Sequence, residues 1–124
     1  MSLVLNAARR ALGSAAMIAL CANLAAAGER LTGDQITAQI AGKTVTGAME
    51  SSGEYAEYYQ ADGMIKGKDY IGKWSVEGDS MCFQYGADPK SCWQVAVDGD
   101  RIEWLMDGKV AGTGIIVDGN PNNF

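Results

Sequence analysis

The sequence predicts a small, mainly β domain: a short helix followed by an up-and-down antiparallel meander of about eight strands. Asp-Gly and Gly-Asp turn signals recur between short runs of alternating residues. The registers set by neighbouring turns also place all three tryptophans on one face of the sheet. Closure removes exposed strand edges, so we expect a small barrel or a strongly bent sheet, with a β-sandwich as the alternative.

The first 27 residues have the pattern of a secretory signal peptide. Arg9-Arg10 precede an uncharged, alanine-rich run that ends at Ala27, which predicts export and cleavage after Ala27. The alternatives are a membrane anchor, for which the run is short, and acylation at Cys21, which lacks the small preceding residue that such processing requires. We therefore expect a periplasmic or secreted protein with one domain over 28–124 and no membrane span after cleavage.

The composition argues against several classes of function. The chain has no histidine, which removes Ser-His-Asp and Cys-His catalysis and the commonest metal ligand. Residues 28–124 carry 8 basic and 15 acidic side chains, a net charge of −7, which disfavours nucleic acid and anionic membrane surfaces. No phosphate-binding glycine loop or calcium-hand loop occurs in the sequence. We therefore expect no enzyme activity, no cofactor and no metal site.

Cys82 and Cys92 are the two cysteines that remain after cleavage, and in an exported protein they predict a disulfide. The turn signal Gly86-Ala87-Asp88-Pro89 lies midway between two β-rich runs. Pairing the two cysteines sets Met81 opposite Trp93 and gives the hairpin one apolar face. The alternatives are two buried free thiols or a redox pair, although the spacing is not that of a Cys-x-x-Cys motif.

The neighbouring turns extend this register. A two-residue turn at Gly78-Asp79 places Trp74 on the face that holds Trp93. A turn at Asp98-Gly99 then sets Trp93 opposite Trp104. The shared face is expected to form the core or to line a pocket, and its tryptophans are Trp74, Trp93 and Trp104.

Upstream of the meander, the segment Thr32–Ala41 predicts a short helix. Thr32 and Gln35 form a capping box, and Ile36 and Ile40 supply an apolar stripe. The remaining alternating runs predict strands at Lys43–Glu50, Glu54–Gln60, Met64–Lys68, Tyr70–Val76, Ser80–Tyr85, Ser91–Val97 and Lys109–Val117.

Few side chains are candidates for chemistry. Glu54 and Glu57 lie in a run that holds three of the five tyrosines, and paired carboxylates beside aromatic rings occur in glycosidases. The two glutamates point to opposite faces of a strand because their separation is odd, so we interpret them as solvated charges rather than as a carboxylate-only hydrolase. Tyrosine suits surfaces that are partly apolar and partly wet, so the predicted contact residues are Tyr55, Tyr58 and Tyr59.

Several short motifs occur in a fixed order. They are Leu31-Thr32-Gly33, Gly42-Lys43-Thr44, Gly72-Lys73-Trp74-Ser75-Val76, Cys82 and Cys92-Trp93. In these motifs the chain resembles an uncharacterised family of small secreted proteins of Gram-negative bacteria, with a Leu-Thr-Gly opening helix and a Cys…Cys-Trp hairpin. The resemblance implies export, a small β fold and the disulfide, but no particular activity. Gly72-Lys73-Trp74 is also similar to the Gly-x-Trp of lipocalins, which implies a distant calycin-like barrel.

The leading functional hypothesis is a non-enzymatic periplasmic binding module for a protein or an envelope component, such as an inhibitor of a secreted hydrolase. It follows from the predicted export, the disulfide and the lack of a catalytic set in the sequence. The second hypothesis is a lipocalin-like carrier of a small apolar ligand in the mouth of the barrel. A carrier would line a pocket with the tryptophan rings, whereas a filled module would pack them together.

Overall fold

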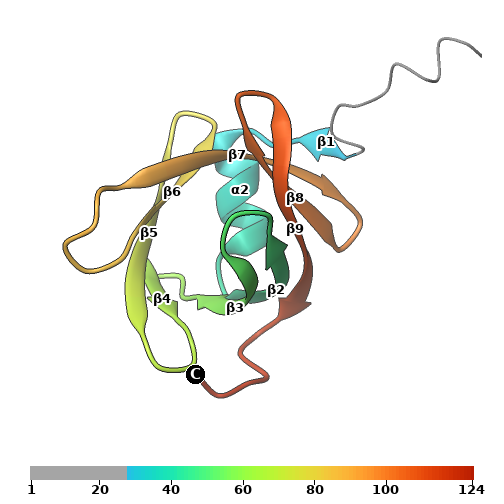
Figure 1. The fold of residues 1–124 in the computed structure, drawn as a ribbon. Coiled ribbons are helices and arrows are strands. Elements are labelled where there is room, and N and C mark those ends of the chain that lie inside the picture. Colours follow the sequence, from blue (N-terminus) through green and yellow to red (C-terminus); the bar gives the residue numbers. More distant parts are fainter. Residues whose placement is uncertain (1–27) are drawn as a thin grey trace, which may run out of the picture.

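The computed structural model describes residues 28–124, so the predicted signal peptide and Cys21 lie outside the described residues. In the described part, β2 to β9 form a closed antiparallel barrel in up-and-down order, and the short β1 pairs with β7 (Figure 1). The barrel closes because β9 pairs with both β8 and β2. The predicted mainly β meander is confirmed, as a barrel rather than a sandwich.

The helix and the seven strands with predicted ranges agree with the prediction to within two residues at each end, whereas β1 was not predicted and β8 was predicted only by the turn that precedes it. The observed elements are β1 (Glu29–Arg30), α2 (Gly33–Ile40), β2 (Lys43–Met49), β3 (Gly53–Tyr59), β4 (Met64–Lys66), β5 (Ile71–Glu77), β6 (Ser80–Gln84), β7 (Ser91–Asp98), β8 (Arg101–Met106) and β9 (Lys109–Asp118). Among residues 28–124, no helix has the length and apolar character needed to cross a membrane.

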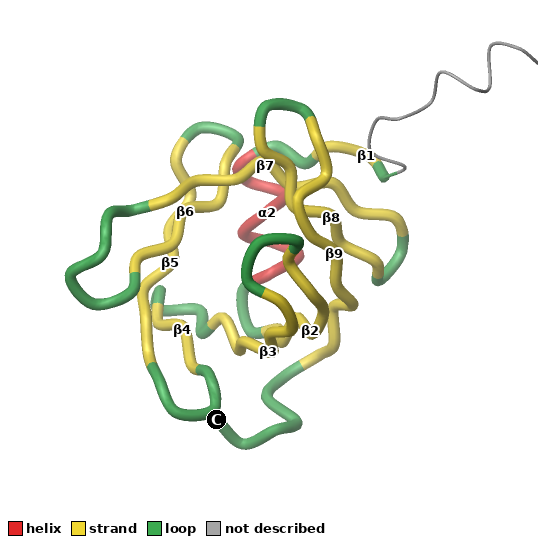
Figure 2. Tube along the Cα trace, viewed as in Figure 1, coloured by secondary structure: helices red, strands yellow, loops and turns green. Residues whose placement is uncertain are grey.

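Helix α2 begins with the predicted capping box. The Gln35 backbone N–H donates to Thr32 Oγ1 at 3.4 Å, and the Thr32 backbone N–H donates to Gln35 Oε1 at 2.9 Å. Ile36 and Ile40 are fully buried in the core. Seen down the barrel in Figures 1 and 2, α2 crosses the opening that the strands enclose. The helix therefore plugs one end of the barrel.

The plug is fixed to the turn between β5 and β6. The backbone N–H of Gly33 donates to Asp79 Oδ1 at 2.9 Å. A Cβ atom at Gly33 would lie only 2.2 Å from the carbonyl oxygen of Gly78. The close approach of helix and turn therefore requires glycine at position 33.

The predicted register of β5, β6 and β7 is confirmed. Trp74 pairs with Phe83, Met81 pairs with Trp93, and Cys82 pairs with Cys92. The two cysteine sulfur atoms lie at bonding distance, with the Cα atoms 4.0 Å apart. The disulfide therefore links two neighbouring strands of the barrel.

The register predicted for β7 and β8 is wrong by two residues. Trp104 lies opposite Val95, not opposite Trp93, and the turn is centred on Gly99-Asp100. Gly99 then takes the first central position of the turn with φ of +65°, where glycine is favoured. Because side chains alternate with a period of two, a slip of two residues leaves every side chain on its predicted face. The tryptophans therefore remain on the interior side of the sheet.

The core extends from the plugged end to the middle of the barrel. The Trp104 ring packs edge-on against Phe83, with ring centroids 5.4 Å apart. Tyr59 lies between Phe83 and Trp74, at centroid distances of 6.0 and 6.4 Å. Trp93 is only half-buried and packs against this cluster. The three tryptophans therefore face inward without stacking directly on one another.

Candidate functional site

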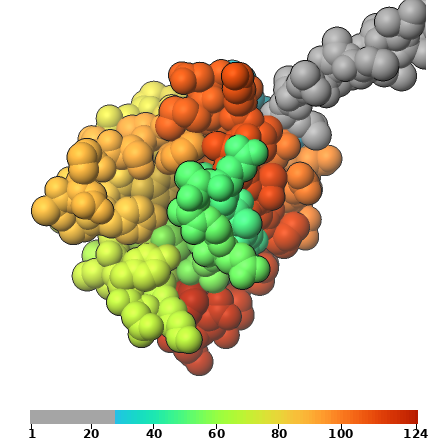
Figure 3. All heavy atoms as spheres, viewed as in Figure 1, coloured from blue at the N-terminus to red at the C-terminus, as the bar shows by residue number. Residues whose placement is uncertain are grey.

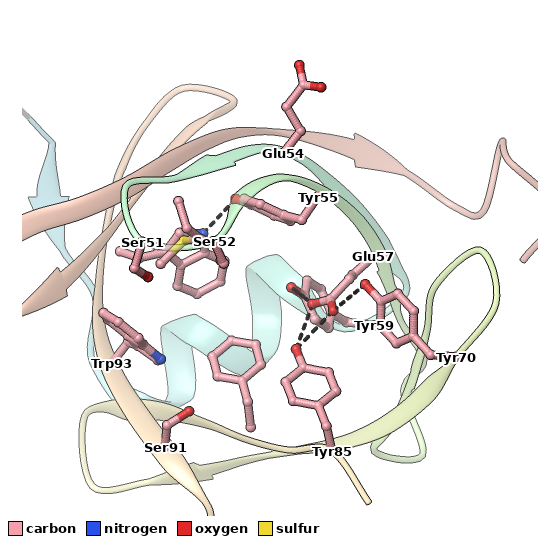
Figure 4. A pocket seen from close by; sticks show the side chains of 13 residues that line it. Ser51, Ser52, Glu54, Tyr55, Glu57, Tyr59, Tyr70, Tyr85, Ser91 and Trp93 are labelled. Carbon is pink, nitrogen blue, oxygen red and sulfur yellow. Dashed lines mark hydrogen bonds between the residues drawn. The ribbon is translucent and has the colours of Figure 1, made fainter. Parts of the chain in front are cut away.

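A cavity of about 380 Å³ occupies the mouth of the barrel opposite α2 (Figure 4). Figure 3 shows the β2–β3 hairpin, in green, lying across the middle of this face. The lining is mostly aromatic, with small hydroxyl residues at the rim. It consists of Met49, Ser51, Ser52, Glu54, Tyr55, Glu57, Tyr59, Tyr70, Phe83, Tyr85, Ser91, Trp93 and Trp104.

The most polar feature of the cavity is the buried carboxylate of Glu57, whose residue is 6% exposed. The Tyr59 hydroxyl donates to Oε1 at 2.8 Å, and the Tyr70 hydroxyl donates to Oε2 at 2.7 Å. The Tyr85 hydroxyl lies 3.0 and 2.9 Å from the two oxygens. The phenols come from β3, from the β4–β5 loop and from the segment after β6, so the carboxylate ties together three parts of the chain (Figure 4).

No lysine or arginine lines this cavity. Within residues 28–124 the ion pairs are Lys43 with Asp118 and Lys90 with Glu77, and neither involves Glu57. Phenol hydroxyls supply strong hydrogen bonds to an anion but no positive charge. The negative charge of Glu57 is therefore hydrogen-bonded but not neutralised by the described part of the chain.

The tyrosines around Glu57 hold their protons more firmly than free tyrosine. Burial raises the pKa of Tyr55 to about 12. Burial also raises the pKa of Tyr59, Tyr70 and Tyr85, and the negative charge of Glu57 adds to each increase. At neutral pH these hydroxyls are therefore protonated and act as donors.

A second hydrogen-bonded chain fixes another part of the cavity wall. Trp104 Nε1 donates to the Tyr55 hydroxyl at 2.7 Å, and that hydroxyl donates to the backbone oxygen of Thr113 at 3.1 Å. A Cβ atom at Gly114 would lie 2.6 Å from the Tyr55 hydroxyl. Glycine on β9 therefore leaves room for the Tyr55 ring beside Trp104.

The structure brings together some of the predicted contact residues and separates others. Tyr55 and Tyr59 line the cavity, whereas Tyr58 alternates to the outer face of β3 and does not line it. Trp93 and Trp104 border the cavity. Trp74 lies deeper in the core, where its indole N–H donates to the backbone oxygen of Gln60 at 2.8 Å.

The interpretation of both glutamates as solvated charges is wrong for one of them. Glu54 is exposed and its carboxylate points away from the cavity, whereas Glu57 points inward (Figure 4). The opposite orientation predicted from their odd separation is therefore observed. The two carboxylates do not face each other across the cavity, so the arrangement gives no support to paired-carboxylate hydrolysis.

Sequence reasoning missed Tyr70 and Tyr85, which complete the group of donors around Glu57. Each lies one residue beyond an observed strand. In the predicted strands Tyr70–Val76 and Ser80–Tyr85, alternation places them on the faces of Trp74 and Met81, so their inward direction could be predicted, whereas their approach to Glu57 could not. The inward direction of Glu57 could be predicted from the sequence. Side chains alternate along a strand, so Glu57 lies on the same face as Tyr55 and Tyr59.

One group of three potential metal ligands exists among residues 28–124, formed by Glu77, Cys82 and Cys92. Its two sulfur atoms are joined to each other in the disulfide. A disulfide sulfur is not the thiolate that binds metals, so this group does not provide a metal site while the disulfide is intact.

No protein-family model, curated protein or solved structure matches this chain. The resemblance to small secreted proteins and to lipocalins therefore stays a prediction. The interpretation of the site depends on its own geometry: an aromatic cavity, closed at its inner end by the core and containing one buried, hydrogen-bonded carboxylate.

Proposed function

We propose that this protein is an exported carrier or receptor that binds a small organic ligand in the mouth of its barrel. The observation that carries the proposal is the cavity of about 380 Å³ lined by aromatic rings around Glu57. Small-molecule sites are concave, mostly apolar and equipped with a few fixed polar groups. The side chains around this cavity match that description.

Two features of the walls support a cavity that stays open without ligand. The Glu57 carboxylate holds three phenols from separate segments, and Trp104 holds Tyr55. Side chains fixed by hydrogen bonds do not rotate freely to fill the space. A pre-formed site also reduces the entropy lost on binding.

Export is supported by two independent features of the chain. The segment over 1–27 has the pattern of a signal peptide, and the disulfide between Cys82 and Cys92 suits an oxidising compartment. A periplasmic or extracellular carrier would meet its ligand outside the cytoplasm.

Binding can be tested with N-phenyl-1-naphthylamine, a neutral apolar dye whose emission rises in apolar surroundings. We expect saturable binding with one dye per chain. Ser91→Phe places a ring at the rim of the cavity and should weaken binding by at least about tenfold, or 1.4 kcal/mol. Ser75→Phe, at an exposed position on β5, is the matched control and should leave the affinity unchanged. Absence of saturable binding, or equal affinity of the two variants, would overturn the proposal.

A further inference from the structure

The carboxylate of Glu57 is buried and has no positive charge beside it in residues 28–124. Buried carboxylates in proteins are normally paired with a cation. Glu57 is 6% exposed and forms no ion pair with a described residue. Because it borders a cavity at the mouth of the barrel, a ligand can bring the missing charge.

Most of the hydrogen-bonding capacity of Glu57 is already used. Oε1 accepts from Tyr59 and Oε2 accepts from Tyr70, and the Tyr85 hydroxyl, which has a single proton to donate, lies within hydrogen-bond distance of both oxygens. A carboxylate offers about four lone-pair sites, so little capacity remains for the N–H groups of a primary ammonium ion. A cation without N–H groups would interact with Glu57 through charge alone and would leave no donor unsatisfied.

The rings that line the cavity suit the same kind of ion. The cavity is lined by four further rings, those of Tyr55, Phe83, Trp93 and Trp104. Glu57 points into this cavity (Figure 4). The negative face of an aromatic ring attracts a weakly hydrated cation, and the attraction is strongest for tryptophan. An anionic ligand would meet the Glu57 charge with no lysine or arginine in the lining to offset it.

We propose that the ligand of this cavity is an apolar quaternary ammonium ion, whose charged head is held beside Glu57 by charge and by the surrounding rings. This inference rests on the proposed function, because it assigns the ligand class of the same cavity. It predicts that the cavity prefers organic cations to the neutral apolar ligands of a general carrier, and that it does not bind fatty acids, which are anionic.

The inference can be tested with four probes that share a benzyl or phenyl body: benzyltrimethylammonium, benzylammonium, benzyl alcohol and benzoate. Their affinities are measured by displacement of N-phenyl-1-naphthylamine and by calorimetry at low ionic strength. In the wild-type protein we expect the cation to bind at least about tenfold more tightly than the alcohol and benzoate not to bind. Benzylammonium, which carries three N–H donors, should bind more weakly than the quaternary ion.

Glu57→Gln keeps the size of the side chain and removes its charge. We expect it to weaken binding of benzyltrimethylammonium by about tenfold or more while benzyl alcohol changes by less than about twofold. Glu29→Gln is the matched control, because it makes the same substitution on an exposed glutamate of β1 that does not line the cavity. It should leave the affinities for all probes within about twofold.

The outcomes separate the two proposals. Equal wild-type affinities for benzyltrimethylammonium and benzyl alcohol would overturn the quaternary ammonium assignment and leave the binding function standing. Binding of benzoate would overturn it as well. Failure of every probe and of the dye to bind would overturn both proposals. The wild-type comparison needs no variant, so the assignment remains testable even if Glu57→Gln does not fold.

Discussion

The two ends of the barrel bury their side chains in opposite ways. At the end plugged by α2, the helix residues Ile36 and Ile40 are completely excluded from solvent. At the mouth, aromatic rings and a carboxylate are held apart by hydrogen bonds around a cavity of about 380 Å³. The plugged end is packed as protein interiors usually are, whereas the mouth keeps unfilled space.

The difference shows how a small domain can keep a cavity without collapsing. Aliphatic side chains are close-packed at one end and supply non-directional hydrophobic stabilisation. Phenol-to-carboxylate bonds at the other end are directional, so they hold Tyr70 and Tyr85 in place without filling the space between them. Stability is therefore expected to be concentrated beside the helix and binding at the mouth.

The largest expected effect comes from the plugged end. Ile40→Ala removes a fully buried side chain and should lower the free energy of unfolding by about 2–5 kcal/mol. Met49→Ala, at the half-buried rim of the cavity, should cost well under half as much because its surroundings are already open. Urea unfolding followed by tryptophan fluorescence measures both values. Similar losses for the two variants would contradict the division of roles between the ends.

A smaller effect is expected where a hydrogen bond to Glu57 is removed. Tyr59→Phe deletes the donor that lies 2.8 Å from Oε1, and a hydrogen bond to a charged group contributes about 1.5–3 kcal/mol. Because Tyr70 and Tyr85 remain as donors, we expect a loss near the lower limit. Tyr58→Phe, one position away on the outer face, is the matched control and should cost less than about 0.5 kcal/mol. The same urea titration compares the two.

The barrel was largely predictable because its constraints are local. Turn residues and the disulfide fix the register of β5, β6 and β7. The slip between β7 and β8 was not predictable from the pattern, since Gly99 is compatible with both turns and a two-residue slip preserves the interior face. Alternation along a strand identifies faces, but it does not distinguish registers that differ by two.

The site was less predictable because it is assembled from distant segments. The alternation of side chains along β3 places Tyr55, Glu57 and Tyr59 on one face. Once that face is known to be the interior one, the burial of Glu57 follows. Nothing local indicates that Tyr70 and Tyr85 reach the same carboxylate from 13 and 28 positions away. Their convergence depends on the curvature of the closed sheet, which a single sequence does not encode in any short pattern.

Alkaline pH should destabilise the mouth of the barrel before the plugged end, because the tyrosines around Glu57 ionise there. The folded-state pKa of Tyr55 is about 12, and burial also raises those of Tyr59, Tyr70 and Tyr85 above their unfolded values. Groups with raised pKa values stabilise the folded state fully below pH 10, and this stabilisation is lost as the pH rises from 10 towards the folded-state pKa. We expect the free energy of unfolding to fall between pH 10 and pH 12. Tyr85→Phe should reduce that fall, and an identical pH profile in wild type and variant would contradict the assignment.

The smallest expected effect concerns the other buried glutamate, Glu103. It tests whether Glu57 is the only one of the two buried glutamates of residues 28–124 that lacks a positively charged partner. Glu103 on β8 is 5% exposed, and the backbone N–H of Gly28 donates to its Oε1 at 3.0 Å. Gly28 is the residue that the predicted cleavage would make the first of the mature chain, and its nitrogen would then be a charged α-ammonium. Glu103 would gain an ion pair within the chain, whereas Glu57 would still depend on a ligand.

The comparison can be made on a chain that begins at Gly28, with and without N-terminal acetylation, which removes the charge but keeps an N–H donor. We expect acetylation to lower the free energy of unfolding by about 0.5–1 kcal/mol, because Gly28 is only half-buried and water can therefore screen the charge of its nitrogen. In Glu103→Gln the effect of acetylation should vanish, and in Glu57→Gln it should persist in full. Persistence in Glu103→Gln would show that the amino group acts elsewhere. The two buried carboxylates would then be alike in lacking a cation, and burial alone could no longer single out Glu57 as the residue that recognises a ligand.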